Sequence, residues 1–426
     1  GDIQWTPRAF RFEVGGSVRY IDYENGSDEA DGASPERPWK HHPWDARATG
    51  KAAAASGIQT YVFKGGVIYR GQLTIKEQGR PGLPIRLTRD PRWGDGPATI
   101  AGSQVVTGWT KGAEDRRIPE PDAVWKARLD FAPRTVWLTD AGGSTTRLPL
   151  ARHPNWKSQP EDHKAQWFTW TNDRHPFRAK EGFSANDATR LKGLDPDFVN
   201  GALIYSEFGW VMGTPYPTRV NRFDPKDGSV QFAGWTGGGN ASIIFRGMRY
   251  YLEDKPQYLD DPEGEFWFDR QGAGGTLYAR LPPGIDPNSA RIEAGRHADL
   301  VLGTDVKHLE ISGLDFRWTT QPWDLDVVAW DFRTRPFGVR PEANPACIRI
   351  WGQGEGIRVA HCRFEDAVMG IRMRAIGEGA PIRDITVEDN VFRNLDAGAA
   401  HFTAGAGWGF SHPVGVLDEV RLYRNY

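Results

Sequence analysis

The sequence predicts an all-β fold, a right-handed parallel β-helix (a solenoid) that carries an inserted β-rich domain. Composition is the first observation, since 50 Gly and 30 Pro among 426 residues describe a turn-rich chain. The second is a repeat of alternating apolar and polar residues near the C-terminus. The third is a long interruption of regular strand patterns across the middle of the chain.

The repeat consists of three segments that align without gaps. Each alternates apolar and polar residues, which is typical of a strand with one buried face. Each segment ends in a phenylalanine, so we expect these three rings to form one internal column. The segments are residues 308–316, 356–364 and 384–392, and the phenylalanines are Phe316, Phe364 and Phe392.

A second, shorter strand follows each segment, which gives coils of about 25 residues. Such a coil cannot bury its apolar face alone. Stacking coils at the interstrand spacing of about 4.8 Å builds one continuous core and satisfies the backbone. A propeller is the alternative, but it needs tight hairpin turns that these linkers lack. The second strands are residues 346–351, 370–375 and 399–403.

The interruption of the repeat divides the chain into three predicted parts. Residues 1–104 hold the first coils with a capping segment, residues 105–293 an inserted β-rich domain, and residues 294–426 the later coils. A fourth copy of the repeat, at residues 419–426, stops before its final aromatic position. Because an open coil leaves its core and edge exposed, we expect the native chain to continue beyond Tyr426.

Several stretches resemble known carbohydrate-active proteins. Residues 18–39 contain a strand, then Gly-Ser-Asp, Asp-Gly, Ser-Pro and Pro-Trp, an order that resembles the opening coil of extracellular β-helix polysaccharide-active proteins. Residues 146–155, 258–269 and 275–283 resemble parts of β-helix glycoside hydrolases that carry an inserted domain, such as the β-xylosidase type. The resemblance implies an enzyme of the cell exterior, either secreted or located at the cell surface or in the periplasm.

Acidic and aromatic residues gather in the connections between first and second strands, at residues 317–345, 365–369 and 393–398. Stacking places matched residues of neighbouring coils about 5 Å apart, so carboxylates can pair along this edge. Glycoside hydrolysis needs such a pair, because one carboxyl protonates the leaving oxygen while the other acts at the anomeric carbon. The catalytic candidates are Glu365, Asp366, Asp396 and His401.

Sugar rings stack on aromatic side chains and bind carboxylates through their hydroxyls, so the same edge supplies candidates for substrate binding. The alternative for the aspartates is a turn, since Asp readily accepts hydrogen bonds from its own backbone. The alternative for His401 is a stacked structural histidine. The substrate-binding candidates are Trp318, Trp323, Asp324, Trp330, Asp331, Trp408 and His412.

A short acidic turn offers a candidate Ca²⁺ site. Asp22, Asp28 and Asp31 place hard oxygen ligands within a few residues of one another. The spacing is not that of an EF-hand, so a network of aspartate turns is the alternative. The predicted hydrolysis itself requires no cofactor.

Charge and hydropathy exclude several partners. The 53 basic and 55 acidic side chains nearly cancel, so no general field attracts nucleic acid. No run of about 18 apolar residues exists to span a membrane, and no nucleotide-binding fingerprint is present. Aromatic residues make up 12% of the chain, which fits sugar stacking beside ordinary core packing. The expected partner is a polysaccharide or oligosaccharide, and the oligomeric state stays open.

We therefore expect a secreted polysaccharide-degrading glycoside hydrolase that uses paired carboxylates in a β-helix groove. A polysaccharide lyase is one alternative, since it shares the β-helix and removes a proton beside a uronate, commonly with Ca²⁺. A non-catalytic carbohydrate-binding or surface module is the other, because solenoids make rigid rods and fold does not determine function.

Overall fold

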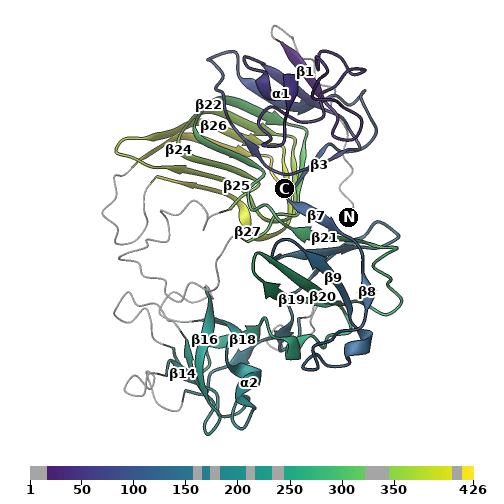
Figure 1. The fold of residues 1–426 in the computed structure, drawn as a ribbon. Coiled ribbons are helices and arrows are strands. Elements are labelled where there is room, and N and C mark those ends of the chain that lie inside the picture. The colour runs from purple at the N-terminus through teal and green to yellow at the C-terminus, as the bar shows by residue number, and fades with distance from the viewer. Residues whose placement is uncertain are drawn as a thin grey trace.

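In the part of the chain that the structure describes, the fold is all-β, with a large parallel sheet and three antiparallel sheets (Figure 1). The computed structural model describes residues 17–156, 166–172, 183–207, 216–232, 244–321, 345–404 and 415–426. In these ranges the helices are short: α1 (Gly50–Ala54), α2 (Pro196–Val199), and 3-10 turns at Pro121–Ala123 and Pro256–Tyr258. None of the helices described has the length and apolar character that a membrane crossing requires.

The parallel sheet curves around one apolar core, and its strands fall into three series of parallel neighbours. The first series is β1 (Val18–Ile21), β2 (Thr60–Phe63), β5 (Ile85–Arg89), the C-terminal parts of β22 (Val301–Ser312) and β24 (Ile348–Ala360), β26 (Pro381–Glu388) and β28 (Val416–Tyr423). The second is β3 (Ile68–Arg70), β6 (Thr99–Ala101), β23 (Asp315–Arg317) and the N-terminal parts of β25 (Arg363–Ala375) and β27 (Val391–Thr403). The third is β4 (Leu73–Thr74), the N-terminal parts of β22 and β24, and the C-terminal parts of β25 and β27.

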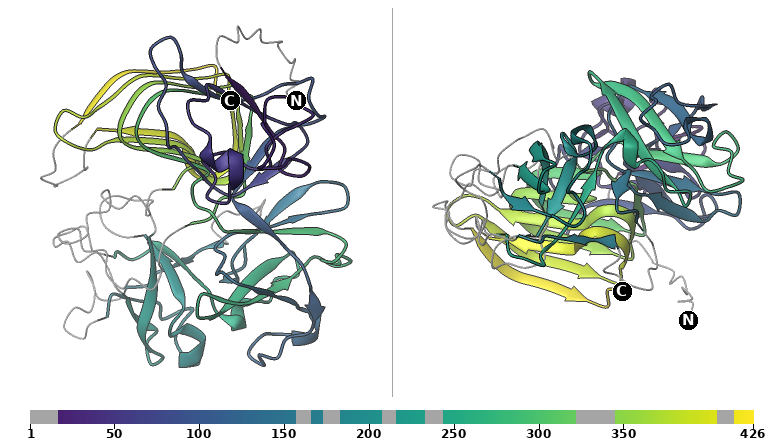
Figure 2. Two further views of the ribbon diagram at one scale, coloured as in Figure 1. Left: turned by 45° about the horizontal axis from the view of Figure 1, so that its top comes forward. Right: turned by 90° about the horizontal axis from the view of Figure 1, so that it is seen from below.

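The strand register is the one that the sequence repeat predicts. Leu309 pairs with Ile357, Ile357 with Ile385, and Ile385 with Val420 of the fourth copy. These apolar positions face the shared core, because side chains alternate between the two faces of a strand. The yellow and green strands of β24 to β28 lie side by side in both views of Figure 2.

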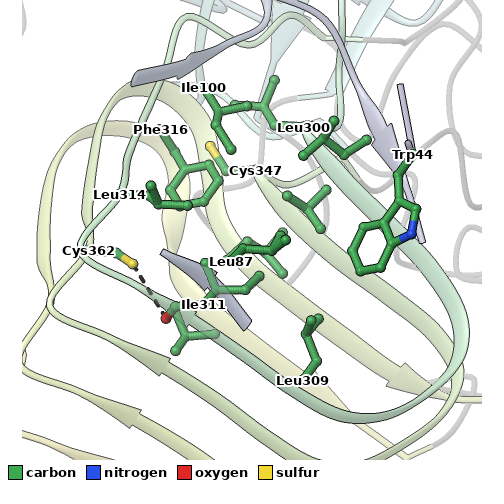
Figure 3. Packing of buried hydrophobic residues seen from close by; sticks show 14 of the residues in the cluster. Trp44, Leu87, Ile100, Leu300, Leu309, Ile311, Leu314, Phe316, Cys347 and Cys362 are labelled. Carbon is green, nitrogen blue, oxygen red and sulfur yellow. Dashed lines mark hydrogen bonds between the residues drawn. The ribbon is translucent and has the colours of Figure 1, made fainter. Parts of the chain in front are cut away.

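The three phenylalanines form the expected single column. The ring centroids of Phe316 and Phe364 are 5.0 Å apart with an interplanar angle of 9°. Those of Phe364 and Phe392 are 4.9 Å apart at 7°. Phe316 and Phe364 are fully buried, and Figure 3 shows Phe316 inside the core with Leu314 and Ile100. This prediction is confirmed.

The two cysteines belong to the same core as free thiols. Cys347 and Cys362 are both buried. The sulfur of Cys362 lies 3.7 Å from the carbonyl oxygen of Ile311, as the dashed line in Figure 3 marks. Burial raises the pKa of the Cys362 thiol to about 12, so it stays protonated and acts as a small apolar residue.

The chain passes from the second series to the third at residues with positive φ. The corner residues are Trp318, Asp366 and Asn394, with φ of 59°, 52° and 51°. Asp and Asn adopt this left-handed backbone more readily than other non-glycine residues. The sequence predicts separate connections at residues 365–369 and 393–398. This is wrong, because β25 and β27 continue through both segments and only bend there.

Three antiparallel sheets lie between residues 103 and 295 (Figure 1). The first is β11 (Thr145–Leu148), β10 (Val136–Thr139), β21 (Arg291–Gly295) and β7 (Ser103–Val106). The second is β19 (Glu265–Gln271), β20 (Gly274–Arg280), β9 (Trp125–Leu129) and β8 (Thr110–Lys111). The third has seven strands: β12 (Arg152–His153), β18 (Arg249–Glu253), β15 (Leu203–Ser206), β16 (Tyr216–Asp224), β17 (Ser229–Phe232), β14 (Ala185–Asn186) and β13 (Phe168–Thr169). The boundaries predicted for the inserted domain fall inside β7 and β21.

A buried ion pair joins the parallel sheet to the sheet of β21. Arg70 of β3 makes two hydrogen bonds, of 2.7 and 2.8 Å, to the carboxylate of Glu293 in β21. The hydroxyl of Ser103 donates a third, of 2.7 Å, to the same carboxylate. Because Glu293 is fully buried, its carboxylate has no contact with water, and these donors replace that contact. The pair therefore holds the two sheets in one arrangement.

Candidate functional site

A cleft of about 500 Å³ lies among the seven-stranded sheet, the sheet of β10 and β11, and the parallel sheet. Small-molecule sites usually measure roughly 300–1,000 Å³. Tyr205 of β15 and Tyr251 and Glu253 of β18 line it from the antiparallel side, and Asp396 of β27 lines it from the parallel sheet. The cleft therefore brings together two carboxyl groups that are far apart in the sequence.

Alternation along β18 directs Glu253 into the cleft. Tyr250 and Leu252 are fully buried in the core of the seven-stranded sheet. Tyr251 and Glu253 face the other way and line the cleft. The rings of Tyr251 and its strand partner Tyr205 stack, with centroids 4.7 Å apart and an interplanar angle of 12°. This pair gives the cleft an aromatic surface beside Glu253.

Glu253 is a carboxyl group that has no direct ion-pair partner among the described residues. It is 8% exposed, and its carboxyl oxygens make no hydrogen bond or ion pair to the residues that the structure describes. Burial raises its pKa to about 7, Arg152 opposes the rise, and Asp254 adds to it. A carboxyl group with a pKa near 7 is half protonated at neutral pH and can deliver a proton to a leaving group.

Asp396 reaches the cleft because β27 bulges. Ala367 of β25 pairs with Leu395, and Met369 pairs with Gly398. Residues 396 and 397 of β27 therefore lie opposite residue 368 alone. A bulge of this kind bends the strand and redirects a side chain, and such bulges are common beside active sites.

Arg147 of β11 pairs with Asp396 across the cleft. The Asp396 side chain keeps 27% of its surface exposed. Burial raises the pKa of Asp396, Arg147 opposes the rise, and Asp366 adds to it. The two carboxyl groups of the cleft thus have different surroundings, since Asp396 makes a direct ion pair with Arg147, while among the described residues Glu253 makes no ion pair. When two carboxyl groups of one site have different surroundings, one can serve as a proton donor while the other stays a carboxylate.

Two further arginines line the cleft. Arg152 lies over the ring of Tyr251, with its guanidinium carbon 3.7 Å from the ring centroid. It donates to the carbonyl oxygens of Pro154 and Gln166, at 2.9 and 2.6 Å. Arg134 makes no hydrogen bond or ion pair to any residue in the described ranges. Burial lowers the pKa of both side chains, but guanidinium groups stay charged at neutral pH.

Two of the predicted catalytic acids lie at the corner between series rather than in the lining of the cleft. Arg317 places a guanidinium nitrogen 2.6 Å from the carboxylate of Asp366 and 3.6 Å from that of Glu365. Asn394 also donates to Asp366, at 3.1 Å. Both acids are buried. They hold the corner together through side-chain contacts, whereas the turn alternative expects Asp366 to accept hydrogen bonds from its own backbone.

His401 and Trp318 also lie away from the cleft lining. His401 is exposed and neighbours Arg372 in register. Partial burial lowers its pKa, and the charge of Arg372 adds to the effect. Trp318 is 1% exposed and packs against Trp137. The expectation that Trp318 offers a face to a sugar ring is wrong, because its ring is enclosed between sheets.

The acidic turn near the N-terminus uses its carboxylates internally. Asp22 accepts hydrogen bonds from the backbone of residues 24 and 25 and from Lys64. Asp28 accepts from the backbone and ring of His41, and Asp31 from the backbone of residue 33. Among the described residues, no group of three or more His, Cys, Asp or Glu side chains is arranged to hold a metal ion. The aspartate-turn alternative accounts for the backbone contacts of Asp22 and Asp31, whereas Asp28 binds His41, 13 residues away.

Six predicted substrate-binding residues lie outside the described residues. Their assignment stays a prediction. They are Trp323, Asp324, Trp330, Asp331, Trp408 and His412.

Sequence reasoning missed Glu253, Arg134 and Arg152. A weak signal for Glu253 exists in residues 249–253, where Tyr and Leu alternate with polar or aromatic residues and an acid ends the strand. Nothing in the sequence indicates that this strand end faces Asp396, because residues 253 and 396 meet only through the packing of separate sheets.

Comparisons with known proteins identify similar folds only. A scan of protein-family models and a search of curated proteins found no match. A solved structure named as a glycoside hydrolase superposes with a TM-score of 0.56 at 13% identity, over 96% of this chain and 80% of that chain. The complex structure of XylC with xylose gives a TM-score of 0.33 at 10% identity, over 91% of this chain and 68% of that chain. The first likeness is one of fold, and the second is too low to support an argument.

Proposed function

We propose that this protein is a glycoside hydrolase that cleaves a polysaccharide or oligosaccharide in the cleft. The observation that carries the proposal is Glu253, a buried carboxyl group with a pKa of about 7, in the same sugar-sized cleft as Asp396. The stacked rings of Tyr205 and Tyr251 provide a surface for the apolar face of a sugar. The fold likeness to a protein named as a glycoside hydrolase is in keeping with this activity.

The proposed reaction uses the two carboxyl groups differently. Glu253 donates its proton to the glycosidic oxygen as the bond from that oxygen to the anomeric carbon breaks. Asp396, kept beside Arg147, either removes a proton from the attacking water or attacks the anomeric carbon first. Water completes the reaction in both cases. The anomeric configuration of the first product, read by NMR, separates the two roles of Asp396.

The proposal extends to architecture and location. The three series of parallel strands are taken as the faces of a right-handed β-helix, with residues 105–293 as its inserted domain. The exterior location implied by the resemblance of residues 18–39 suits an enzyme that meets polysaccharide outside the cell. Ca²⁺ has no assigned part in the reaction.

The test is reducing-sugar release from a panel of neutral and acidic glycans by the wild-type chain and by Glu253→Gln. We expect the variant to lose about 10²- to 10⁴-fold in kcat/KM, which is the usual contribution of a general acid. Glu265→Gln is the matched control, because Glu265 is also a buried carboxyl group with a pKa raised to about 8 but does not line the cleft. Full activity of Glu253→Gln would refute the assignment.

A lyase is the second candidate, and the three arginines of the cleft favour it, since lyases must neutralise a uronate carboxylate. Elimination also needs a base. Burial raises the pKa of Tyr205 and Tyr251 far above neutrality, which makes both phenols poor bases. Ultraviolet absorbance of an unsaturated product would identify elimination, because hydrolysis forms no such double bond. Binding without any turnover would instead indicate a non-catalytic module.

A further inference from the structure

Among the described residues, the ionisable groups that line the cleft do not balance in charge. Arg134, Arg147 and Arg152 are cations, while Glu253 and Asp396 are the acids. Asp396 is paired with Arg147. With Glu253 partly protonated at neutral pH, the cleft keeps at least one positive charge that no described acid compensates.

Arg134 is the cation with the least compensation. The acid with the largest effect on it is Asp254, and this carboxylate already accepts a hydrogen bond of 2.6 Å from Arg219. Arg152 differs, since its guanidinium is held by two backbone carbonyls and by the ring of Tyr251. A partly buried guanidinium without a partner is unfavourable, and an anionic ligand would remove that cost.

We propose, on the basis of the proposed function, that the substrate of this cleft contains a uronic acid. We propose further that Arg134 binds the carboxylate of this sugar. The planar fork of a guanidinium matches a planar carboxylate with two parallel hydrogen bonds, which a lysine cannot offer. The cleft is large enough for a sugar ring beside the tyrosine pair. Arg134 thereby selects acidic over neutral sugars.

Measuring binding affinity tests this inference independently of catalysis. The probes are uronic-acid oligosaccharides and the same oligosaccharides after carboxyl reduction, which converts each carboxylate to a hydroxymethyl group without changing the linkage. Isothermal titration calorimetry measures both sets with the wild-type chain. We expect at least one acidic probe to bind about tenfold more tightly, or better, than its reduced form, as one charge-assisted bidentate contact implies. Equal affinities, or no binding by any acidic probe, would overturn the inference.

Variants assign the preference to Arg134. Arg134→Gln should abolish the difference between acidic and reduced probes, and Arg134→Lys should keep part of it. Arg128→Gln is the control, since it removes the same charge from β9, where Arg128 contacts Gln271 and Thr276. Thermal melting checks that each variant folds. A preference that survives in Arg134→Gln would refute the role of this residue.

The outcomes also distinguish this inference from the proposed function. Preferential binding of acidic probes without turnover contradicts the hydrolase and supports the inference. Turnover of neutral glycans alone contradicts the inference and supports the hydrolase. Tighter binding of sulfated than of uronic-acid oligosaccharides would show that the anion is a sulfate and would overturn the assignment to a carboxylate.

Discussion

Two carboxyl groups in one cleft differ because of their neighbours. Glu253 ends β18 where a buried face meets the cleft, and it has no counter-ion among the described residues. Asp396 sits in a bulge beside Arg147. At the scale of the residue, the consequence is the raised pKa of Glu253, which two measurements test.

The proposed hydrolase activity should depend on the protonation of Glu253. A general acid must carry its proton, so kcat/KM should fall about tenfold per pH unit above a pKa near 7. Kinetics across the pH range check this. An alkaline limb that is unchanged in Glu253→Gln would show that another group controls it.

The stability of the chain should depend on the same group. The unfolded chain ionises Glu253 near 4.5 and the folded protein near 7, so the folded state loses stability as pH rises between these values. Glu253→Gln cannot ionise and escapes this loss. The variant should match the wild type at low pH and exceed it by about 3 kcal/mol at about pH 8. Urea unfolding at both pH values measures this, and a constant difference would contradict it.

At the scale of the element, stacked strands convert a sequence repeat into columns. Phe316, Phe364 and Phe392 lie in register on β23, β25 and β27, so each ring packs against the one above. The same strands continue through the corner at Asp366 to the bulge at Asp396. Phe392 of the core column and Asp396 of the cleft therefore lie on the same strand, β27. Packing of the column holds this strand in register with β25, and the bulge at Asp396 is positioned by that register.

Replacing a phenylalanine of the column by alanine should lower the free energy of unfolding most where the ring is enclosed on both sides. Phe364→Ala should lower the free energy of unfolding by about 3–5 kcal/mol, through lost burial and the cavity left behind. Phe392→Ala should cost less, because Phe392 is half-buried at the end of the column. Leu422→Ala, at an exposed position, is the control. Denaturant unfolding ranks the stabilities of the three variants. An equal loss of stability in all three would contradict the packing described for the column.

At the scale of the molecule, the cleft exists because separate sheets are held in place. Arg70 and Glu293 join the parallel sheet to the sheet of β21, and Arg147 and Asp396 join it to β11. Trp318 fills the first junction beside Arg70, Arg291 and Arg317, at 6.0, 5.2 and 4.7 Å from their guanidinium carbons. These contacts hold the sheets of β21 and β11 against the parallel sheet, which carries Asp396.

Glu293→Gln should destabilise the protein by about 3–5 kcal/mol, because it leaves the guanidinium groups of Arg70 and Arg291 without their charged partner. The double replacement Arg70→Met and Glu293→Met should recover part of that loss, since the Arg70–Glu293 pair is then removed as a whole, while Arg291, 3.4 Å from Glu293 and 40% exposed, loses its partner in both variants. Thermal unfolding compares the variants. If the single and double variants were equally stable, the ion pair would not join the sheets as described.

The sequence alone determined the parallel register and the core column. Alternation with period two and the alignment of three segments are local properties of the chain, and a strand with one apolar face can bury it only in one register. The same repeat predicted that Asp396 lies between the first and second strands of a coil, where acidic residues of neighbouring coils gather. It also predicted Glu365 and Asp366 as catalytic, although these acids are bound by Arg317 at the corner.

Tertiary structure decided the composition of the cleft. Glu253, Arg134 and Arg152 belong to strands or loops whose local patterns resemble any half-buried strand, and no repeat aligns them with Asp396. Their meeting depends on how the antiparallel sheets dock, which rests on long-range ion pairs and enclosed aromatic rings. The raised pKa of Glu253 comes from that docking, since burial in the assembled cleft, rather than any adjacent residue, is its main cause.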